Sequence, residues 1–154
     1  MSDFKKKVLD EVVMVLKKEL ASLEKALGDS SAAATDPGSK AEGKYDTRSL
    51  EMSYLAAGQA RQAEALVGQI EILQRFQVVD FEMSGAVALG ALLELDQEGE
   101  WNWYFLLPTG GGIELEVEDC QITTLTPESP LYEQLDGKRI GESIGKAGMV
   151  SELR

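Results

Sequence analysis

The side chains of this chain that could do chemistry are carboxylates, lysines and a single thiol, because its 154 residues include no histidine. Ser-His-Asp triads, imidazole acid/base catalysis and most catalytic zinc sites all require that missing ring. Cys120 has no second cysteine with which to pair, and it lacks the usual base for a catalytic thiol. We therefore interpret Cys120 as a small residue of a strand.

Charge is divided unevenly along the chain. Residues 1–76 carry 11 basic and 12 acidic side chains, whereas residues 77–154 carry 4 basic and 15 acidic ones. A phosphate backbone would repel such an acidic half and a basic protein surface would attract it, so we expect no independent nucleic-acid binding. The acidity could equally serve only to keep a small domain soluble. The sequence shows no signal peptide and no membrane span, which predicts a cytoplasmic protein with no membrane partner.

Two long helices are predicted in the first part. Apolar residues spaced alternately by four and three are typical of a coiled-coil seam. The first seam is Leu9, Val13, Leu16, Leu20, Leu23 and Leu27; the second is Met52, Ala56, Gln59, Ala63, Leu66, Ile70 and Leu73, with Gln59 as a polar interruption that could fix the register. Gly28 has the character of a helix C-cap. We expect residues 1–78 to form an antiparallel two-helix coiled-coil hairpin with its tip at residues 28–44.

Six lysines accompany the first helix: Lys5, Lys6, Lys7, Lys17, Lys18 and Lys25. They could face RNA or an acidic channel wall. The more ordinary interpretation, which we favour, is that they form the solvated face of the helix.

The second part, residues 79–154, is predicted to be an antiparallel β domain with one short helix, so the fold class is α+β. The expected strands are Ala86–Leu95, Trp101–Leu107, Ile113–Glu118 and Cys120–Leu125, the first two joined by a hairpin loop at Asp96–Glu100. Trp101 and Trp103 should share a packed face. Gly110–Gly112 lacks the Lys-Ser/Thr of a phosphate loop and is interpreted as a tight turn. Ser129 should cap a short helix that starts at Pro130 and runs to Leu135.

The order of motifs in this part resembles the Gre transcription elongation factors. The segments that carry the resemblance are Tyr104–Gly112, Thr126–Leu131 and Asp136–Glu142, and it extends over most of Gly85 to Glu142. It implies a two-helix coiled coil followed by an FKBP-like β domain. It also implies a protein that binds bacterial RNA polymerase, inserts its hairpin into the secondary channel and modulates elongation or transcript cleavage.

The resemblance also implies a docking site. Glu128, Ser129 and Pro130 occupy the positions of an acidic-Ser-Pro corner with which Gre factors grip the rim of the polymerase beside that channel. The same three residues could form a plain capped turn that needs no partner.

At the hairpin tip, Gre factors carry two acidic residues that help the polymerase hold a second Mg²⁺ for RNA cleavage. Matching Tyr45 to the tip tyrosine of the family places Lys44 and Gly38 where those acids belong. Asp36, Glu42 and Asp46 lie close by and could substitute. We expect no tightly bound cofactor, and Mg²⁺ shared with the polymerase if cleavage is stimulated. Nascent RNA is then met only within the polymerase complex, and the protein is no enzyme in its own right.

Two alternative functions remain open. A self-associating coiled-coil adaptor or structural protein would need no polymerase. A prolyl isomerase is suggested only by the FKBP-like fold, and a fold does not carry a function.

Overall fold

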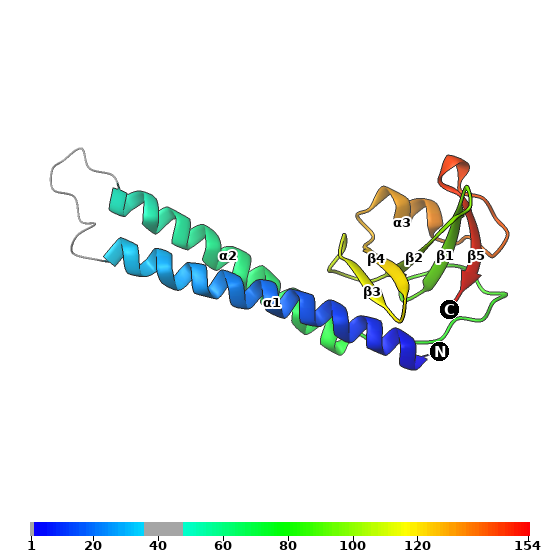
Figure 1. The fold of residues 1–154 in the computed structure, drawn as a ribbon, viewed down its shortest axis with the longest axis horizontal. Helices are drawn as coiled ribbons and strands as arrows, with labels where there is room; N and C mark the ends of the chain where they lie inside the picture. The colour runs from blue at the N-terminus through cyan, green and yellow to red at the C-terminus, as the bar shows by residue number, and fades with distance from the viewer. Residues whose placement is uncertain (1, 36–47) are drawn as a thin grey trace. The chain divides into compact units, whose positions relative to one another are not determined.

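The computed structural model describes residues 2–35 and 48–154 of the chain (Figure 1). The elements are α1 (Ser2–Thr35), α2 (Arg48–Arg75), β1 (Leu92–Gln97), β2 (Glu100–Leu106), β3 (Glu114–Val117), β4 (Cys120–Leu125), α3 (Pro130–Leu135), a 3₁₀ turn (Gly145–Ala147) and β5 (Met149–Leu153). The α+β class is therefore confirmed: a two-helix hairpin precedes a five-stranded sheet and one short helix.

The chain divides into two compact units, and the long helices contribute to both. One unit contains Val15–Glu71; the other combines Met1–Met14 with Ile72–Arg154.

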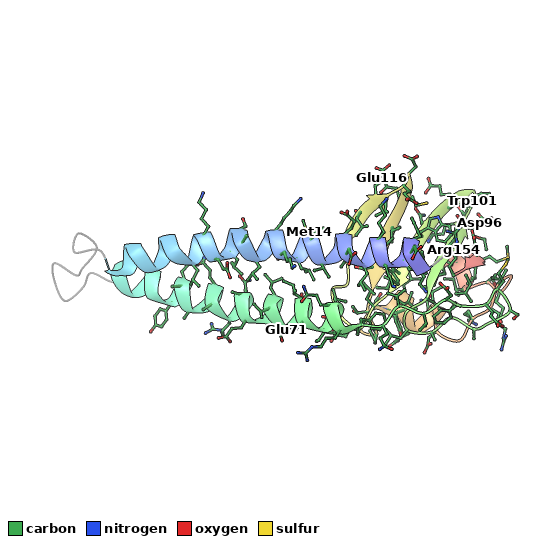
Figure 2. The ribbon with its side chains drawn as sticks, turned by 90° about the horizontal axis from the view of Figure 1, so that it is seen from below. Met14, Glu71, Asp96, Trp101, Glu116 and Arg154 are labelled. Atoms are coloured by element: carbon green, nitrogen blue, oxygen red, sulfur yellow. The ribbon has the colours of Figure 1, made fainter. Side chains whose placement is uncertain are left out.

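In the unit Val15–Glu71, the helices α1 and α2 run side by side in both views (Figures 1 and 2). Leu16, Leu66 and Ile70 are buried along the predicted seam. The remaining seam positions with described side chains, Leu20, Leu23, Leu27, Ala56, Gln59 and Ala63, are half-buried. Gln59 is the polar interruption: its Oε1 is buried and meets no hydrogen-bond donor among the described residues.

The prediction that Gly28 ends the first helix is wrong, because α1 continues to Thr35. A C-cap glycine adopts a positive φ, and Gly28 does not. A glycine inside a helix costs only about 1 kcal/mol relative to alanine, which a long helix can absorb. The first eight residues of the predicted tip 28–44 are consequently helical.

The other unit contains the sheet, whose strand order is β3-β4-β2-β1-β5. The prediction of a wholly antiparallel domain is wrong in one place, because β2 and β4 pair in parallel, with Trp103 opposite Ile122 and Leu106 opposite Leu125. The other three pairings are antiparallel. The parallel pair arises because β3 lies at the edge and β4 returns between β3 and β2.

Two predicted turns are confirmed. Gln97 pairs with Glu100, and the two residues between them have positive φ angles of 58° and 88°, as a tight hairpin turn requires. Between β2 and β3, the triglycine turn has positive φ at Gly110 and Gly112. The buried hydroxyl of Thr124 holds this turn, donating to Gly110 O at 2.5 Å and accepting from Ile113 N at 3.0 Å.

Both faces of the sheet are covered, which explains why its strands are so apolar. One face, with Leu93, Leu95 and Leu106, packs against Tyr132 and Leu135 of α3. The opposite face carries the buried side chains of Leu92, Trp103, Phe105 and Ile122. The first turns of α1 belong to this same unit. Their buried side chains cover a wider face of the helix than a single coiled-coil seam would; they are Lys5, Val8, Leu9, Val12 and Val13.

Three strand predictions need correction. β1 starts at Leu92, not at Ala86, because the chain turns just before it: Ala91 N donates to Ala88 O, and Gly90 has a φ of 92°. The apolar run before Leu92 reflects a loop that is buried at Val87, Gly90 and Ala91 and exposed at Ala88 and Leu89. The sequence did not predict β5. Its pairing with β1 shifts register between Glu94 and Leu95, so the side chains of β5 do not alternate regularly between the two faces of the sheet. Trp101 is 65% exposed, although Trp103 on the same face is buried.

The burial of Leu16, only 3% exposed, gives a test of the seam. Leu16→Ala should lower the free energy of unfolding by roughly 2 to 5 kcal/mol, through lost apolar burial and the cavity left behind. Met14→Ala is the matched control, because Met14 lies on the same helix and is 49% exposed. Urea denaturation of both variants checks the prediction; equal losses would contradict a buried seam.

Candidate functional site

The corner predicted for docking is the turn between β4 and α3. Ser129 N donates to Thr126 O at 2.9 Å, which closes the turn, and Glu133 N donates to Ser129 O at 3.2 Å, which starts the helix. Glu128 and Pro130 are exposed and Ser129 is half-buried. The structure therefore brings the three predicted residues together at the protein surface.

Ser129 lies at the N-cap position with extended backbone angles, and Pro130 begins the helix, as expected. The Ser129 side chain, however, makes no capping hydrogen bond. A serine at this position commonly accepts from the backbone N–H two or three residues later. The expected capping contact is thus not formed.

The corner stands on a rigid base. α3 has six residues, and two of them, Tyr132 and Leu135, are buried in the core of the domain. Burial, with the nearby charge of Asp136 as a second cause, raises the pKa of the Tyr132 phenol. Glu128, in the turn before α3, and Pro130, at its start, are therefore presented from a backbone anchored in the core.

The segment Asp136–Glu142, which carries part of the resemblance, has a structural role. Val87 N donates to Lys138 O and Gly137 N donates to Val87 O, both at 2.7 Å, so this segment fastens the loop before β1. The guanidinium of Arg139 donates to Ser84 O. These bonds position α3 by holding the chain that follows it.

An open hollow of about 760 Å³ lies beside α3. Its lining mixes both signs of charge: Glu133, Gln134, Asp136, Lys138, Ser143, Ile144, Gly145 and Lys146. Among the residues of the chain that the structure describes, no cluster of three or more carboxylate or thiol side chains could hold a metal ion. Nor does any helix of the described part have the length and apolarity to cross a membrane.

The tip residues predicted from the resemblance lie outside the described residues. This applies to the acidic candidates Asp36, Glu42 and Asp46, to the aligned positions Gly38 and Lys44, and to Tyr45. The assignment of the tip stays a prediction.

The acidic side chains of β3 are confirmed as one face of an alternating strand. Glu114 and Glu116 are exposed, whereas Val117 is buried and Leu115 is half-buried. Cys120, the first residue of β4, is a partly exposed free thiol opposite Val117, in keeping with its interpretation as a strand residue.

The lysines of α1 do not all behave alike. Lys6, Lys7, Lys17, Lys18 and Lys25 are exposed, as a solvated face requires. Lys7 pairs with Glu118 at 3.0 Å. Lys5 is fully buried, so its side chain can neither contact RNA nor belong to the solvated face of the helix.

Lys5 joins three segments of its unit. Its Nζ donates to Val79 O at 2.6 Å and to Arg154 O at 3.0 Å. The ammonium also stands 4.9 Å from the ring centre of Phe81 and 5.9 Å from that of Phe105. Burial lowers the Lys5 pKa from 10.5 to about 8, and the charge of Asp80 opposes this by raising it.

Sequence reasoning missed Lys5 because helical spacing identifies the buried face of a helix only through apolar residues. The signal that could have found it is its spacing: Lys5 precedes Val8, Leu9 and Val12 by three, four and seven residues.

The solved structures that are similar to this chain include two of a GreA homolog. GreA factor homolog 1 (Gfh1) of Thermus thermophilus has 18% identity and a TM-score of 0.37, covering 92% of this chain and 94% of that one. A second structure, of the transcription factor Gfh1, has 21% identity and a TM-score of 0.32, covering 92% and 89%. Neither likeness is close enough to carry an argument about this chain. No family model and no curated protein matches it.

The Lys5 environment predicts a pH dependence of stability. The unfolded chain holds the Lys5 proton more tightly than the folded chain, so the free energy of unfolding should rise with pH between about 8 and 10.5. The full gain is about 3 kcal/mol. Below pH 8 the cost of the buried charge is fully present.

The measurement is urea denaturation of the parent and of Lys5→Met at about pH 7 and about pH 10. Relative to Lys5→Met, the parent should have a higher free energy of unfolding at about pH 10 than at about pH 7. Other groups that titrate in this range are present in both proteins and cancel. An equal difference in the free energy of unfolding at both pH values would show that Lys5 does not titrate between them.

Proposed function

We propose that this protein is a Gre-type regulator of bacterial RNA polymerase. It docks on the polymerase through its β domain, places its helical hairpin in the secondary channel, and modulates elongation or transcript cleavage. The observation that carries the proposal is the exposed Glu128-Ser129-Pro130 corner, in a domain whose motifs resemble the Gre factors in the same order along the chain.

The length of the helices supports the proposal. At a rise of about 1.5 Å per residue, the 34 residues of α1 extend over roughly 50 Å. Most of the buried apolar side chains of α1 lie in its first half, between Lys5 and Leu16. A helix that continues well beyond its buried portion suits a function of reaching into a partner.

The charge of the protein supports a protein partner over a free nucleic acid. Residues 77–154 carry 15 acidic and 4 basic side chains. Acidic surfaces steer toward basic protein surfaces and away from phosphate backbones. RNA is then contacted only inside the polymerase complex, where the hairpin is already placed by the docked domain.

The tip determines which effect the protein has on cleavage. Mg²⁺ prefers near-octahedral oxygen coordination, so a cleavage factor needs carboxylates at defined positions. The register that aligns Tyr45 puts Gly38 and Lys44 in those positions. A lysine there would repel a cation, because like charges about 4 Å apart cost on the order of 4 kcal/mol near a protein surface. Occupancy of the channel then acts by obstruction or by altering the polymerase.

A second candidate function is self-association of the coiled coil. The observation that favours it is exposed apolar side chains on α2: Tyr54 is 70% exposed, Leu55 50% and Val67 41%. Such residues can pack between two hairpins. Sedimentation of the full chain separates the candidates, because an adaptor of this kind forms a dimer and needs no polymerase.

The docking corner is tested by charge reversal. Glu128→Lys should weaken binding to core RNA polymerase, roughly tenfold for one lost ionic contact, with folding intact. Glu82→Lys is the matched control, since Glu82 is also exposed and makes the same change in net charge. Binding can be measured by fluorescence anisotropy at moderate salt. Equal effects of the two variants would remove the corner from the docking surface.

The tip is tested on halted, backtracked elongation complexes by following release of 3′ RNA. We expect little cleavage, together with competition against an active Gre factor for the same channel. Replacing Gly38 by Asp and Lys44 by Glu together should increase cleavage, because the two carboxylates would restore oxygen ligands for Mg²⁺.

The contrary outcome is rapid cleavage by the parent protein that Asp36→Ala, Glu42→Ala or Asp46→Ala abolishes. It would make the affected residues metal ligands and would overturn the register that aligns Tyr45.

A further inference from the structure

A row of three side chains crosses the sheet next to the β1–β2 hairpin turn. Trp101 on β2 is opposite Asp96 on β1, and Asp96 is opposite Met149 on β5. Side chains of directly opposed residues project from the same face of a sheet. Trp101 is 65% exposed and Met149 41%, and Figure 2 shows Trp101 and Asp96 beside each other. We call these three residues the Trp101 row.

The neighbouring row on the same face shows what such a set of side chains can hold. Trp103 is opposite Glu94, which is opposite Glu152. The guanidinium of Arg154 stands 4.8 Å from the ring centre of Trp103, and its Nε donates to Glu152 at 3.0 Å. One arginine thus contacts an indole face and a carboxylate together, and Trp103 is buried beneath it.

The Trp101 row repeats the indole and the carboxylate of that arrangement. Among the residues whose side chains the structure describes (3–28, 54–146 and 148–154), no arginine or lysine stands over Trp101, and none pairs with Asp96. The Asp96 carboxylate is already oriented, because its Oδ1 accepts a hydrogen bond from Gly99 N at 3.0 Å in the hairpin turn. An arriving cation therefore meets a carboxylate and an indole that are both held by the sheet.

We propose that the Trp101 row binds an arginine side chain of a partner protein. The guanidinium stacks on Trp101 and pairs with Asp96, and its methylene groups contact Met149. Arginine suits this set better than lysine, because its planar group stacks on aromatic rings and donates several hydrogen bonds at once. Tryptophan and arginine are also the residues that most often dominate the energy of protein interfaces.

The net negative charge of residues 77–154 favours a basic protein as the partner and disfavours nucleic acid. Resting on the proposed function, we take the partner to be RNA polymerase. The Trp101 row is then a second contact of the β domain. It lies on the sheet beside the β1–β2 turn, whereas the Glu128 corner lies at the start of α3.

The first experiment measures binding of the full chain and its variants to core RNA polymerase. Trp101→Ala should weaken binding about tenfold, as expected for a desolvated cation–π contact. Asp96→Asn should weaken it severalfold, since asparagine keeps the oxygen that accepts from Gly99 N and loses only the charge. Glu100→Gln is the control for charge, because its side chain leaves the opposite face of β2. Met83→Ala is the control for loss of an exposed apolar side chain.

The second experiment needs no polymerase. The indole N–H resonance of Trp101 is followed by NMR while a capped Gly-Arg-Gly-Arg-Gly peptide is added, with the citrulline peptide of the same shape as the neutral control. We expect a saturable shift with arginine only, absent in Asp96→Asn. The Trp101→Phe variant assigns the resonance.

The outcomes separate the two proposals. If the parent binds polymerase and Trp101→Ala and Asp96→Asn bind equally well, the Trp101 row is no docking contact and the proposed function stands. If the parent does not bind polymerase, the proposed function fails, and the peptide titration alone decides arginine recognition. Equal shifts with arginine and citrulline would overturn that recognition.

Discussion

The constraint that shapes the sheet-containing unit is the burial of Lys5, whose amino group must keep its hydrogen-bond acceptors although its charge is costly to bury. This unit is assembled from two distant segments, Met1–Met14 and Ile72–Arg154, and Lys5 bonds to backbone oxygens at both ends of the second. A buried charge is tolerated only when its hydrogen bonds are satisfied. Its two acceptors and the faces of Phe81 and Phe105 meet that condition, and in doing so they define where the first turns of α1 lie on the domain.

The first turns of α1 and the short helix α3 belong to the same unit as the sheet. Both faces carry buried apolar side chains, and the edge strand β3 presents glutamates. Two accessible places matter for the proposals made above: the Glu128-Ser129-Pro130 corner, in the turn before α3, and the Trp101 row, on the strands beside the β1–β2 turn. Rigid strands support each of them, so a partner that binds there need not order a flexible segment, and less of its binding energy is lost to ordering.

The sheet lies in the acidic part of the chain, residues 77–154. In the proposed function, the field of this acidic domain contributes specificity and association rate, while the corner and the Trp101 row supply affinity. The helical hairpin has a different character: in the unit Val15–Glu71 only Leu16, Leu66 and Ile70 of the seam are buried, and its other described positions are half-buried.

The sequence by itself determined the α+β class, the two helices, the β1–β2 turn, the triglycine turn and the helix beginning at Pro130, because these depend on local spacing and on glycine and proline geometry. Only the tertiary structure decided the parallel pairing of β2 with β4, the loop before Leu92, the strand Met149–Leu153, the burial of Lys5 and the exposure of Trp101. Local patterns record which side chains are apolar, but not which distant segment covers them. Lys5 and Trp101 differ from expectation for that reason. Backbone oxygens from far along the chain accept hydrogen bonds from Lys5, whereas the described residues leave Trp101 largely exposed.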